Sequence, residues 1–453
     1  MSEAEEFARA ADLVYQELLT RLGEGNPQPR LEPTRRVVEL LGDVHRAYPV
    51  IHIAGTNGKT STARMIEAIL RAYGLRTGLF TSPHLVSFAE RILIDGELID
   101  NDALLTNWLD VKPYVEMVDR ELEAKNELRL TYFEVLTILA YGTFADTPVD
   151  VAIVEAGLGG EWDSTNVADG VVAVFTPIAM DHMDRLGSTL DAIARTKSGI
   201  IKPSALVVSA TQEPDVLAVL EEATTLTESP FAYVGREVTV ISNTMAVGGQ
   251  LFSIQGIAGT YNDLFLDLFG DHQAQNAALA IAAVESFLGG ASVELDPNIL
   301  AEAFATVTSP GRLQLIATEP TVLVDAAHNP HGAASLATAL ESYFTFDDVT
   351  AVVAILEDKD AEGILAALQP QVARVIITTA PSERTRTAAN LGAIATKIFG
   401  AENVIIEPDA DVAIEMARGY AAHSPKGAVL ITGSITLVGQ AVGRSNDTNG
   451  WTK

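Results

Sequence analysis

One stretch, residues 50–61 with the sequence VIHIAGTNGKTS, most constrains what this chain can fold into. Its apolar half has the pattern of a buried strand, its glycines are typical of a tight turn, and a helix is expected to begin near Lys59, Thr60 and Ser61. The first turn of a helix offers unpaired N–H groups and a partial positive charge, to which Lys59 adds a full charge. The stretch therefore predicts a loop that holds phosphate groups.

The loop favours a nucleoside triphosphate. Gly55 and Gly58 let the backbone close around anionic oxygens, and the Thr60 hydroxyl can reach a Mg²⁺ ion. The usual P-loop has a glycine five positions before Gly58, where this chain has Ile53, so the match is to the shorter form GTNGK[ST]. A turn without a ligand is the alternative, but it gives the lysine and hydroxyls no reason to occur together. The residues expected to contact the phosphates are Thr56, Asn57, Gly58, Lys59, Thr60 and Ser61.

Charge and composition argue against several classes of function. The chain has 60 acidic and 30 basic residues, a net charge of -30, so its surface repels the backbone of nucleic acids. It has no cysteine, which excludes disulfides, thiolate metal sites and cysteine nucleophiles. The N-terminal stretch is acidic, unlike a secretion signal, and no apolar run reaches about 18 residues. We expect a soluble cytoplasmic protein that binds neither nucleic acid nor membranes.

Strand-like and helix-like stretches alternate in the order that forms βαβ units. The first series has strands at 50–54, 76–80, 149–155, 171–176 and 205–209, and helices at 59–73, 132–144 and 189–198. This order predicts an α/β fold with a doubly wound, mainly parallel sheet. Short alternating stretches between Phe231 and Leu268 predict a small antiparallel sheet, and an alanine-rich helix at about 271–288 closes the domain.

A second α/β series follows the turn-rich segment Thr308–Arg312. Its strands are expected at 313–318, 321–325, 349–355, 372–378, 403–406 and 428–432. The sequence thus predicts two domains, an ATP-binding domain over 1–307 and a smaller Rossmann-like α/β domain over 308–453. The polar tail at 444–453 is expected to fray.

Three polar side chains stand at or just after the ends of strands near the loop. Ser82 follows the strand that ends at Phe80, Glu155 ends its own strand, and His182 follows the strand that ends at Thr176. Because the carboxyl ends of parallel strands meet at one edge of a sheet, these groups are candidates for holding a metal ion near the phosphates. Each residue alone also fits a structural role. Ser82 would belong to a Ser-Pro turn, Glu155 would cap a glycine loop, and His182 would lie in the N-terminal turn of a helix.

Several motifs, taken together, resemble a known family. They are GTNGK at 55–59, TSPHLV at 81–86, EAGLGG at 155–160, DSTN at 163–166, MDH at 180–182 and DAAHNP at 325–330. Over about residues 30–440 the chain resembles the folylpolyglutamate synthase and dihydrofolate synthase branch of the Mur ligase superfamily. The resemblance implies ATP-dependent amide formation. A substrate carboxylate would attack the γ-phosphate to give an acyl phosphate and ADP, and the amine of L-glutamate would displace phosphate.

The resemblance also implies two Mg²⁺ ions beside the loop. The implied ligands are Thr60, Ser82, Glu155 and His182. Lys197 stands where the family carries a carbamylated lysine, which would support a metal, whereas an ordinary surface lysine is the alternative. The residues implied in catalysis are Lys59, Lys197, His182 and Arg312.

The second domain would complete the nucleotide site from across a cleft. The residues implied by the resemblance are Asn276, Arg312, Asp325 and His328. The delocalised charge of Arg312 would stabilise the transferring phosphoryl group once the domains close. The alternatives are a linker arginine paired with an acidic neighbour for Arg312 and a helix-cap amide for Asn276.

A pterin pocket is implied in the first domain. Its residues would be Thr131, Tyr132, Phe133, Glu134, Trp162, Asp163 and Ser164, with Leu31, Glu32 and Pro33 at the edge. Phe133 would stack on the flat ring and Asp163 would pair with ring nitrogens, although a buried Tyr-Phe pair on an amphipathic helix is the alternative. Two positions depart from the family pattern. Thr60 stands where many members have glycine, and Glu161 stands where arginine is common, which puts the handling of an anionic substrate in question.

Three functions stay open at this point. The first is an enzyme that adds L-glutamate to dihydropteroate and then to reduced folates, the second an enzyme limited to polyglutamylation, and the third an ATP-hydrolysing binding or switch protein. The pocket favours the first. A cell-wall Mur ligase is disfavoured, because the motifs at 325–330 and 131–134 point to the folate branch. The expected partners are small molecules only, and the chain is expected to act as a monomer.

Overall fold

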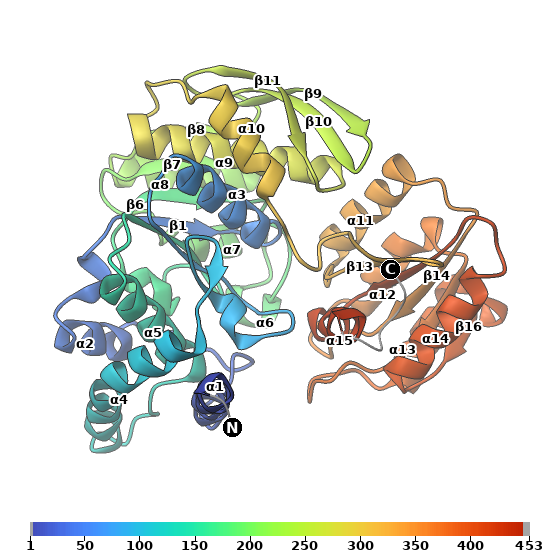
Figure 1. Ribbon diagram of the computed structural model, residues 1–453, viewed down its shortest axis with the longest axis horizontal. Helices are drawn as coiled ribbons and strands as arrows, with labels where there is room; N and C mark the ends of the chain where they lie inside the picture. The colour runs from blue at the N-terminus through green and yellow to red at the C-terminus, as the bar shows by residue number, and fades with distance from the viewer. Residues whose placement is uncertain (1–2, 447–453) are drawn as a thin grey trace.

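The structure is a computed structural model that describes residues 3–446. It has two halves, each built on its own sheets (Figure 1). The first half contains an eight-stranded and a three-stranded sheet, and the second half a six-stranded sheet. This arrangement confirms the predicted α/β fold. The division between residues 307 and 308 stays a prediction.

The phosphate-loop strand lies in the interior of the largest sheet. β1 (Val50–Ala54) is parallel to its neighbours β5 (Val151–Glu155) and β6 (Gly170–Phe175), and every residue of β1 and β5 is buried, as in sheets covered on both faces. The strand order is β4, β3, β2, β5, β1, β6, β7, β8, and only β3 and β4 are antiparallel, which confirms the doubly wound, mainly parallel sheet. The other strands are β2 (Thr77–Phe80), β3 (Ile92–Ile94), β4 (Glu97–Leu98), β7 (Leu206–Ser209) and β8 (Phe231–Tyr233).

The two edges of this sheet differ from the prediction. Phe231–Tyr233 falls in the segment predicted as antiparallel, but β8 pairs in parallel with β7, because a three-residue strand is too short for its pattern to reveal its partner. At the other edge, β3 and β4 form a hairpin that was not predicted. Asp95 and Gly96 between them both have positive φ, as a two-residue type I′ turn requires. The Asp-Gly pair was therefore a usable signal.

Helices cover both faces of the large sheet. On one face, α3 (Lys59–Ala72), α9 (Asp271–Gly289) and α10 (Pro297–Thr306) share an apolar core with Ile51 and Ile53 of β1. The opposite face carries α1 (Glu3–Leu19), α2 (Glu32–Leu40), α4 (Asn101–Glu123), α5 (Tyr132–Asp146), α7 (Leu190–Ser198) and α8 (Pro214–Leu226). Helices α3, α5, α7 and α9 confirm the four predicted in this half.

The other elements of the first half are a small sheet, a short helix and several 3₁₀ turns. The small antiparallel sheet consists of β9 (Thr239–Ala246), β10 (Gly249–Gln255) and β11 (Thr260–Leu266), as predicted. A short helix, α6 (Met183–Leu186), directly follows His182. The 3₁₀ turns are η1 (Val44–Arg46), η2 (Phe88–Arg91), η3 (Ser164–Val167), η4 (Gln369–Gln371) and η5 (Ala401–Asn403), of which the last two lie in the second half.

The second half is a smaller three-layer α/β unit. Its strand order is β12, β13, β17, β14, β15, β16, and all but β12 are parallel. The strands are β12 (Gln314–Thr318), β13 (Thr321–Asp325), β14 (Asp348–Val353), β15 (Arg374–Ile377), β16 (Val404–Ile406) and β17 (Gly427–Thr432). One face packs on α11 (Pro330–Tyr343), α12 (Ala361–Leu368) and α13 (Ala388–Phe399), and the other on α14 (Ala410–Ala421) and α15 (Ile435–Asn446).

The polar tail begins later than predicted. Arg444 still belongs to α15 and pairs with Asp411 and Glu415 of α14, so these charges extend the helix. The rest of the predicted tail, 447–453, lies outside the described residues. Within residues 3–446, no helix combines the length and the apolar character needed to cross a membrane.

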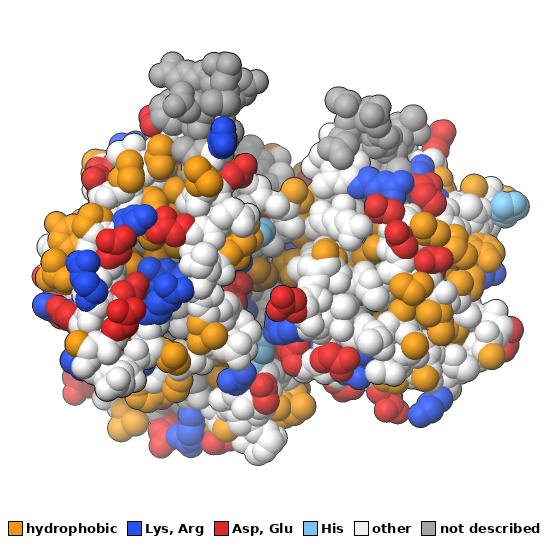
Figure 2. Space-filling model, turned by 90° about the horizontal axis from the view of Figure 1, so that it is seen from below, with side chains coloured by type: hydrophobic (Ala, Val, Ile, Leu, Met, Phe, Trp, Pro, Cys, Tyr) orange, Lys and Arg blue, Asp and Glu red, His pale blue; other side chains and the backbone are white. Residues whose placement is uncertain are grey.

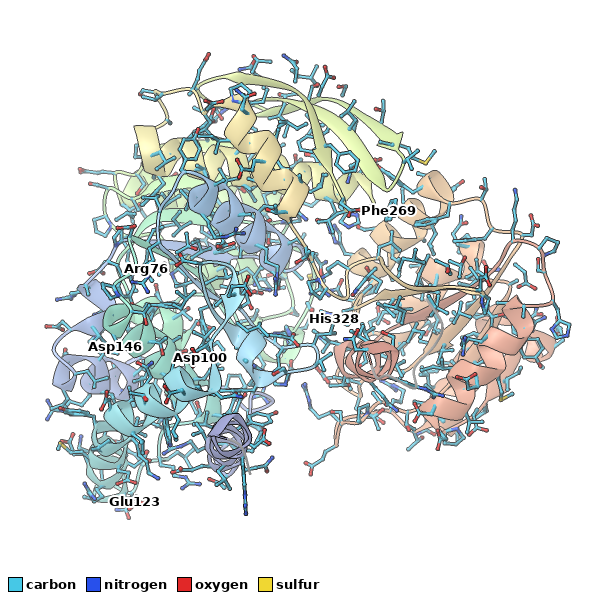
Figure 3. All side chains as sticks on the ribbon, in the orientation of Figure 1. Arg76, Asp100, Glu123, Asp146, Phe269 and His328 are labelled. Atoms are coloured by element: carbon cyan, nitrogen blue, oxygen red, sulfur yellow. The ribbon has the colours of Figure 1, made fainter. Side chains whose placement is uncertain are left out.

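Tyr343, at the end of α11, joins the two halves away from the cleft. Its hydroxyl oxygen lies 2.7 Å from Oδ1 of Asp271 at the start of α9 and 3.1 Å from Oε1 of Gln250 on β10. The side-chain amide of Asn243 on β9 donates to the same hydroxyl at 3.0 Å. Phe269 packs edge-on against the Tyr343 ring, at the position labelled in Figure 3. The second half is thereby anchored on the small sheet and on α9.

We predict that Tyr343→Phe lowers the free energy of unfolding by about 1 kcal/mol, the value of one net hydrogen bond. Urea denaturation measures the loss. Tyr420→Phe is the matched control, because the Tyr420 ring packs under Arg374 and its hydroxyl has no hydrogen-bond partner that the described residues show. Equal effects of the two substitutions would contradict the anchoring role.

Candidate active site

A cleft of about 1010 Å³ separates the two halves, and its walls come from both (Figure 2). It brings together side chains that the sequence predicted from positions far apart. From the loop and the nucleotide set, the cleft is lined by Thr56, Asn57, Gly58, Lys59, Thr60, Ser61, Asn276, Arg312, Asp325 and His328. From the metal, catalytic and pterin sets, it is lined by Ser82, Glu155, His182, Lys197, Thr131, Phe133, Glu134, Trp162, Asp163 and Ser164.

The loop has no space for side chains at its glycines. Gly58 has φ +88°, and a Cβ there would come within 2.6 Å of Oδ1 of Asn276. A Cβ at Gly55 would overlap the hydroxyl of Thr176. The Thr56 hydroxyl accepts a hydrogen bond from the amide of Ala179 at 3.0 Å, which ties the loop to the segment after β6. The backbone is thus held close to β6 and α9, as a phosphate-binding turn requires.

Two lysines bracket the loop. Nζ of Lys59 lies 3.3 Å from the carbonyl oxygens of both Gly55 and Thr56. Nζ of Lys197 donates to the same Gly55 carbonyl at 2.7 Å and is buried, which excludes an ordinary surface lysine. Burial, and then the nearby charge of Lys59, lower the pKa of Lys197 to about 7. A substantial share of Lys197 side chains is therefore neutral near neutral pH.

Two of the other three predicted metal ligands, Thr60 and Ser82, contact Glu155. The Thr60 hydroxyl donates to Oε2 of Glu155 at 2.9 Å, and the backbone amide of Ser82 lies 3.4 Å from the same oxygen. Burial raises the pKa of Glu155, whereas the charge of Lys59 and the hydrogen bond from Thr60 lower it and so offset part of this rise. A carboxylate with the Thr60 hydroxyl beside a phosphate loop offers the hard oxygen donors that Mg²⁺ prefers, and Ser82 lines the same cleft. Within residues 3–446 no cluster of three or more His, Asp or Glu side chains could hold a metal alone, so nucleotide oxygens or water would have to complete the site.

His182 makes its contacts elsewhere in the cleft. Its Nε2 lies 3.4 Å from Nζ of Lys359, and the residue has φ +50°, which is uncommon for a residue other than glycine. Burial, and then the charge of Lys359, lower the pKa of His182 to about 4. The imidazole is therefore neutral near pH 7, as a metal ligand must be. The structure places it beside a lysine of the second half and not beside Glu155.

Asp181 lines the cleft and connects the two halves, and although it lies inside the MDH motif at 180–182, no role was predicted for it. Its Oδ1 accepts from Nζ of Lys359 at 2.6 Å, and its Oδ2 accepts from the amide of Asn329 at 3.1 Å. Nε2 of His328 lies 3.5 Å from Oδ2 (Figure 3 labels His328). Burial alone would raise the pKa of Asp181, but the bond to His328 and the charge of Lys359 hold it well below its usual range. The carboxylate is therefore ionised and paired across the cleft.

The phosphate loop itself contacts the second half. The side-chain amides of Asn57 and Asn329 exchange two hydrogen bonds, of 3.1 and 3.0 Å. The hydroxyls of Ser61 and Ser309 lie 2.8 Å apart. Because Asn329 is also the N-cap of α11, the start of that helix is fixed against the loop. Asn329 lies inside the DAAHNP motif and Asn57 inside the GTNGK motif, but nothing in the sequence indicated that the two pair.

Asn276, Arg312, Asp325 and His328 all line the cleft, Asn276 from the first half, and their role in nucleotide binding stays a prediction. Arg312 lines the cleft and forms no ion pair with any residue that the structure describes, which disfavours a paired linker arginine. Asn276 lies in the second turn of α9 and bonds to Gln273 at 3.1 Å, so it is not a helix cap. Asp325 accepts from the backbone amides of Leu313 and Ala327, both at 2.8 Å.

An aromatic pocket lies at the first-half end of the cleft. Phe133 stacks on Phe80 with ring centroids 5.9 Å apart, and Trp162 is 47% exposed. Asp163 is buried, its Oδ2 accepts from the amide of Leu158 at 2.7 Å, and burial raises its pKa. A flat surface beside a fixed carboxylate suits a planar ring with N–H groups.

Some predicted pocket residues have other positions. Tyr132 is buried in the core under the Arg91 guanidinium and does not line the cleft, so the buried-aromatic alternative applies to it. Glu134 lines the cleft, but its carboxylate is bound by Arg30 at 2.9 Å and by the amide of Thr131 at 2.6 Å, so it caps α5. Leu31, Glu32 and Pro33 do not line the cleft. Leu31 packs on the core, and the other two face a separate groove.

Comparisons with known proteins agree with this arrangement. Residues 53–284 match the Mur ligase middle domain, and residues 311–435 match the glutamate ligase domain of Mur ligases. The dihydrofolate synthase/folylpolyglutamate synthase of Mycobacterium tuberculosis is 42% identical over 440 residues, 92% of this chain and 90% of that protein. The protein of that name from Escherichia coli is 34% identical over 346 residues, 76% of this chain and 75% of its own length.

This chain belongs to the dihydrofolate synthase/folylpolyglutamate synthase family of Mur ligases. Solved structures agree. The folylpolyglutamate synthase of M. tuberculosis complexed with ADP is 40% identical, with a TM-score of 0.93 over 97% of this chain and 99% of that one. An E. coli protein in complex with DHPP and ADP is 30% identical, with a TM-score of 0.82 over 95% of this chain and 96% of that one. In this Mur ligase, the cleft lies between the regions matched by the two domain models.

We predict that Lys359→Met lowers the free energy of unfolding by about 3 to 5 kcal/mol, because it leaves the buried charge of Asp181 without its cation. Urea denaturation measures the loss. Lys112→Met is the matched control. Lys112 pairs with Glu17 at 2.8 Å with both side chains partly exposed, and the expected loss is below about 1 kcal/mol. A loss at Lys359 no larger than at Lys112 would contradict the role of Asp181.

Proposed function

We propose that this Mur ligase joins L-glutamate to the carboxylate of 7,8-dihydropteroate, and to the terminal glutamate of reduced folates, with consumption of ATP. One observation carries the proposal. A phosphate loop, a carboxylate with neighbouring hydroxyls and an aromatic pocket with a fixed carboxylate all line one cleft. The names of the relatives, and the structures of relatives with ADP and with DHPP, support the choice of substrates.

The proposed reaction has two steps. A carboxylate oxygen of the acceptor attacks the γ-phosphorus, the bond to the bridging oxygen breaks, and ADP leaves with that oxygen. The amine of L-glutamate then attacks the acyl carbon, loses a proton, and phosphate leaves with the former carboxylate oxygen. Two anions must approach each other in the first step, so positive charge around them is the main requirement. Lys59, Arg312 and the N-terminus of α3 supply that charge in the cleft.

Two Mg²⁺ ions are part of the proposal. Glu155, with the hydroxyls of Thr60 and Ser82, would hold one ion beside the phosphates, where it would neutralise charge on the transferring group. His182, in the segment after β6, would contribute to the second ion. It is neutral near pH 7 and lines the same cleft, which fits that role.

The acceptor is proposed to lie with its ring against Phe133 and Trp162 and its N–H groups toward Asp163. The cleft continues from this pocket past the loop to Lys359 and Arg384 in the second half. Its volume of about 1010 Å³ leaves room for acceptors of different length, which supports activity on both dihydropteroate and longer folates. The residues that bind L-glutamate are not part of the proposal.

The remaining parts concern the chain as a whole. We propose a nucleotide-binding domain over 1–307 and a glutamate ligase domain over 308–453, in agreement with the two sets of sheets. A monomer is proposed because one chain supplies both walls of the cleft. A cytoplasmic location is proposed because ATP and L-glutamate are available there.

The test is phosphate release with Mg²⁺, ATP and L-glutamate, given either 7,8-dihydropteroate or a reduced folate monoglutamate, with products identified by mass. We expect glutamate-dependent release and a product one glutamate heavier with both acceptors. Product with the folate alone would reduce the function to polyglutamylation. ATP hydrolysis that is indifferent to both acceptors would overturn the ligase proposal in favour of a switch protein.

We also propose that Lys197 carries a carbamate. Its amine is buried, and its lowered pKa of about 7 leaves it neutral above that pH, which is the form that attacks CO₂. The nitrogen would bond to the carbon of CO₂ and lose a proton, which replaces a cation by an anion near the phosphate loop.

We predict a protein-bound carbamate resonance in ¹³C NMR after equilibration with ¹³C-bicarbonate. The signal should grow as the pH rises through about 7, because protonated amine is lost there. Lys197→Arg should lack it, and Lys112→Arg, at a partly exposed lysine, should keep it. A wild-type protein without the signal at about pH 8 would contradict the carbamate, since the amine is then mostly neutral.

A further inference from the structure

His52 is a fully buried histidine that no step above uses. It lies on β1, three residues before Gly55, and none of its surface is exposed. Along β1 it alternates with Ile51 and Ile53, which pack on the core beneath α3 and α9, so its ring faces the opposite side of the sheet. That side is the side of α5 and the aromatic pocket. A buried polar ring in the middle of a strand requires a partner.

The partner of His52 is Thr165, which in turn bonds to Asp163. Nε2 of His52 lies 2.8 Å from the Thr165 hydroxyl, and this hydroxyl donates to Oδ1 of Asp163 at 2.5 Å. The backbone amide of Thr165 donates to the same oxygen at 3.0 Å. Tyr141 donates to the Thr165 carbonyl at 2.6 Å, which fixes the backbone there. Three side chains thus form a chain of hydrogen bonds from the loop strand to the pocket.

The direction of each bond follows from the number of protons. A threonine hydroxyl has one proton and two lone pairs, and the Asp163 carboxylate can only accept. The hydroxyl proton therefore goes to Asp163, and its oxygen accepts from Nε2–H of His52. With the other tautomer, Nε2 would be an acceptor and would compete with Asp163 for the single proton. Nδ1 of His52 has no hydrogen-bond partner in the described structure, so a proton there would be buried and unpaired.

We propose that His52 and Thr165 are positioning residues that fix the plane of the Asp163 carboxylate for the N–H groups of the pterin ring. The inference rests on the proposed function, because it assumes that the acceptor lies against Asp163. Oδ1 is held by two donors from Thr165 and Oδ2 by the amide of Leu158, so the carboxylate has one orientation before the substrate arrives. Neither His52 nor Thr165 contacts the substrate. Their effect is on acceptor affinity and not on the nucleotide.

The test compares substitutions at Thr165 that differ only in the hydroxyl. Thr165→Val keeps the shape and removes the proton, whereas Thr165→Ser keeps the hydroxyl. The probe is pteroate, whose binding to the full chain is followed by quenching of tryptophan fluorescence, since Trp162 lines the pocket. Thr165→Val should weaken pteroate binding about tenfold or more, the loss expected for a hydrogen bond to a charged group. Thr165→Ser should stay within about threefold of wild type, and the KM for ATP should be unchanged in both.

Substitutions at His52 provide the second comparison. His52→Gln places an N–H donor near the position of Nε2 and should keep pteroate affinity, whereas His52→Leu removes the donor and should weaken it like Thr165→Val. Circular dichroism and the KM for ATP show whether each variant is folded. If wild type binds pteroate and Thr165→Val binds it equally well, or if Thr165→Ser loses as much as Thr165→Val, this inference alone is overturned. If wild type binds neither pteroate nor 7,8-dihydropteroate, the proposed function fails and the inference fails with it.

Discussion

The pairing of Asp181 with Lys359 across the cleft is the interaction on which the rest of the site depends. A buried carboxylate is costly unless a cation and hydrogen-bond donors surround it, and here the cation and the Asn329 amide come from the second half. The same Asn329 bonds to Asn57 in the phosphate loop. The second half is therefore held against the loop, and the cleft is one site and not two facing surfaces.

Charge explains why the site must be arranged in this way. The chain carries a net charge of -30, yet its proposed substrates are anions, so the cations of the cleft must act locally. Lys59 and Lys197 both lie on the carbonyl of Gly55, and Arg312 faces the same space without an ion pair among the described residues. Burial, and then the nearby charge of Lys59, lower the pKa of Lys197, which gives the buried lysine a different chemistry from Lys59.

Much of the first half could be predicted because its signals are local. The strand, turn and helix around Gly55 and Gly58 lie within about one βαβ unit, and the rule that parallel strand ends meet brought Ser82 and Glu155 to the loop. The pair of Asp181 with Lys359 could not be predicted in this way, because it depends on how two separately folded sheets dock. The sequence pattern also could not separate the orientations of two adjacent aromatic residues. Tyr132 is buried in the core, whereas Phe133 faces the cleft. The strand at 231–233 was assigned to the wrong sheet because three residues carry too little periodicity.

Transfer of oxygen from the acceptor to phosphate most directly tests whether ATP is consumed through an acyl phosphate in this cleft. The measurement uses 7,8-dihydropteroate labelled with ¹⁸O in both carboxylate oxygens, together with Mg²⁺, ATP and L-glutamate, and the released phosphate is analysed by mass. Attack by the carboxylate on the γ-phosphorus predicts one ¹⁸O atom in each phosphate formed. Phosphate without ¹⁸O, formed while glutamate is added to the acceptor, would contradict the mechanism, because the oxygen would then have come from water.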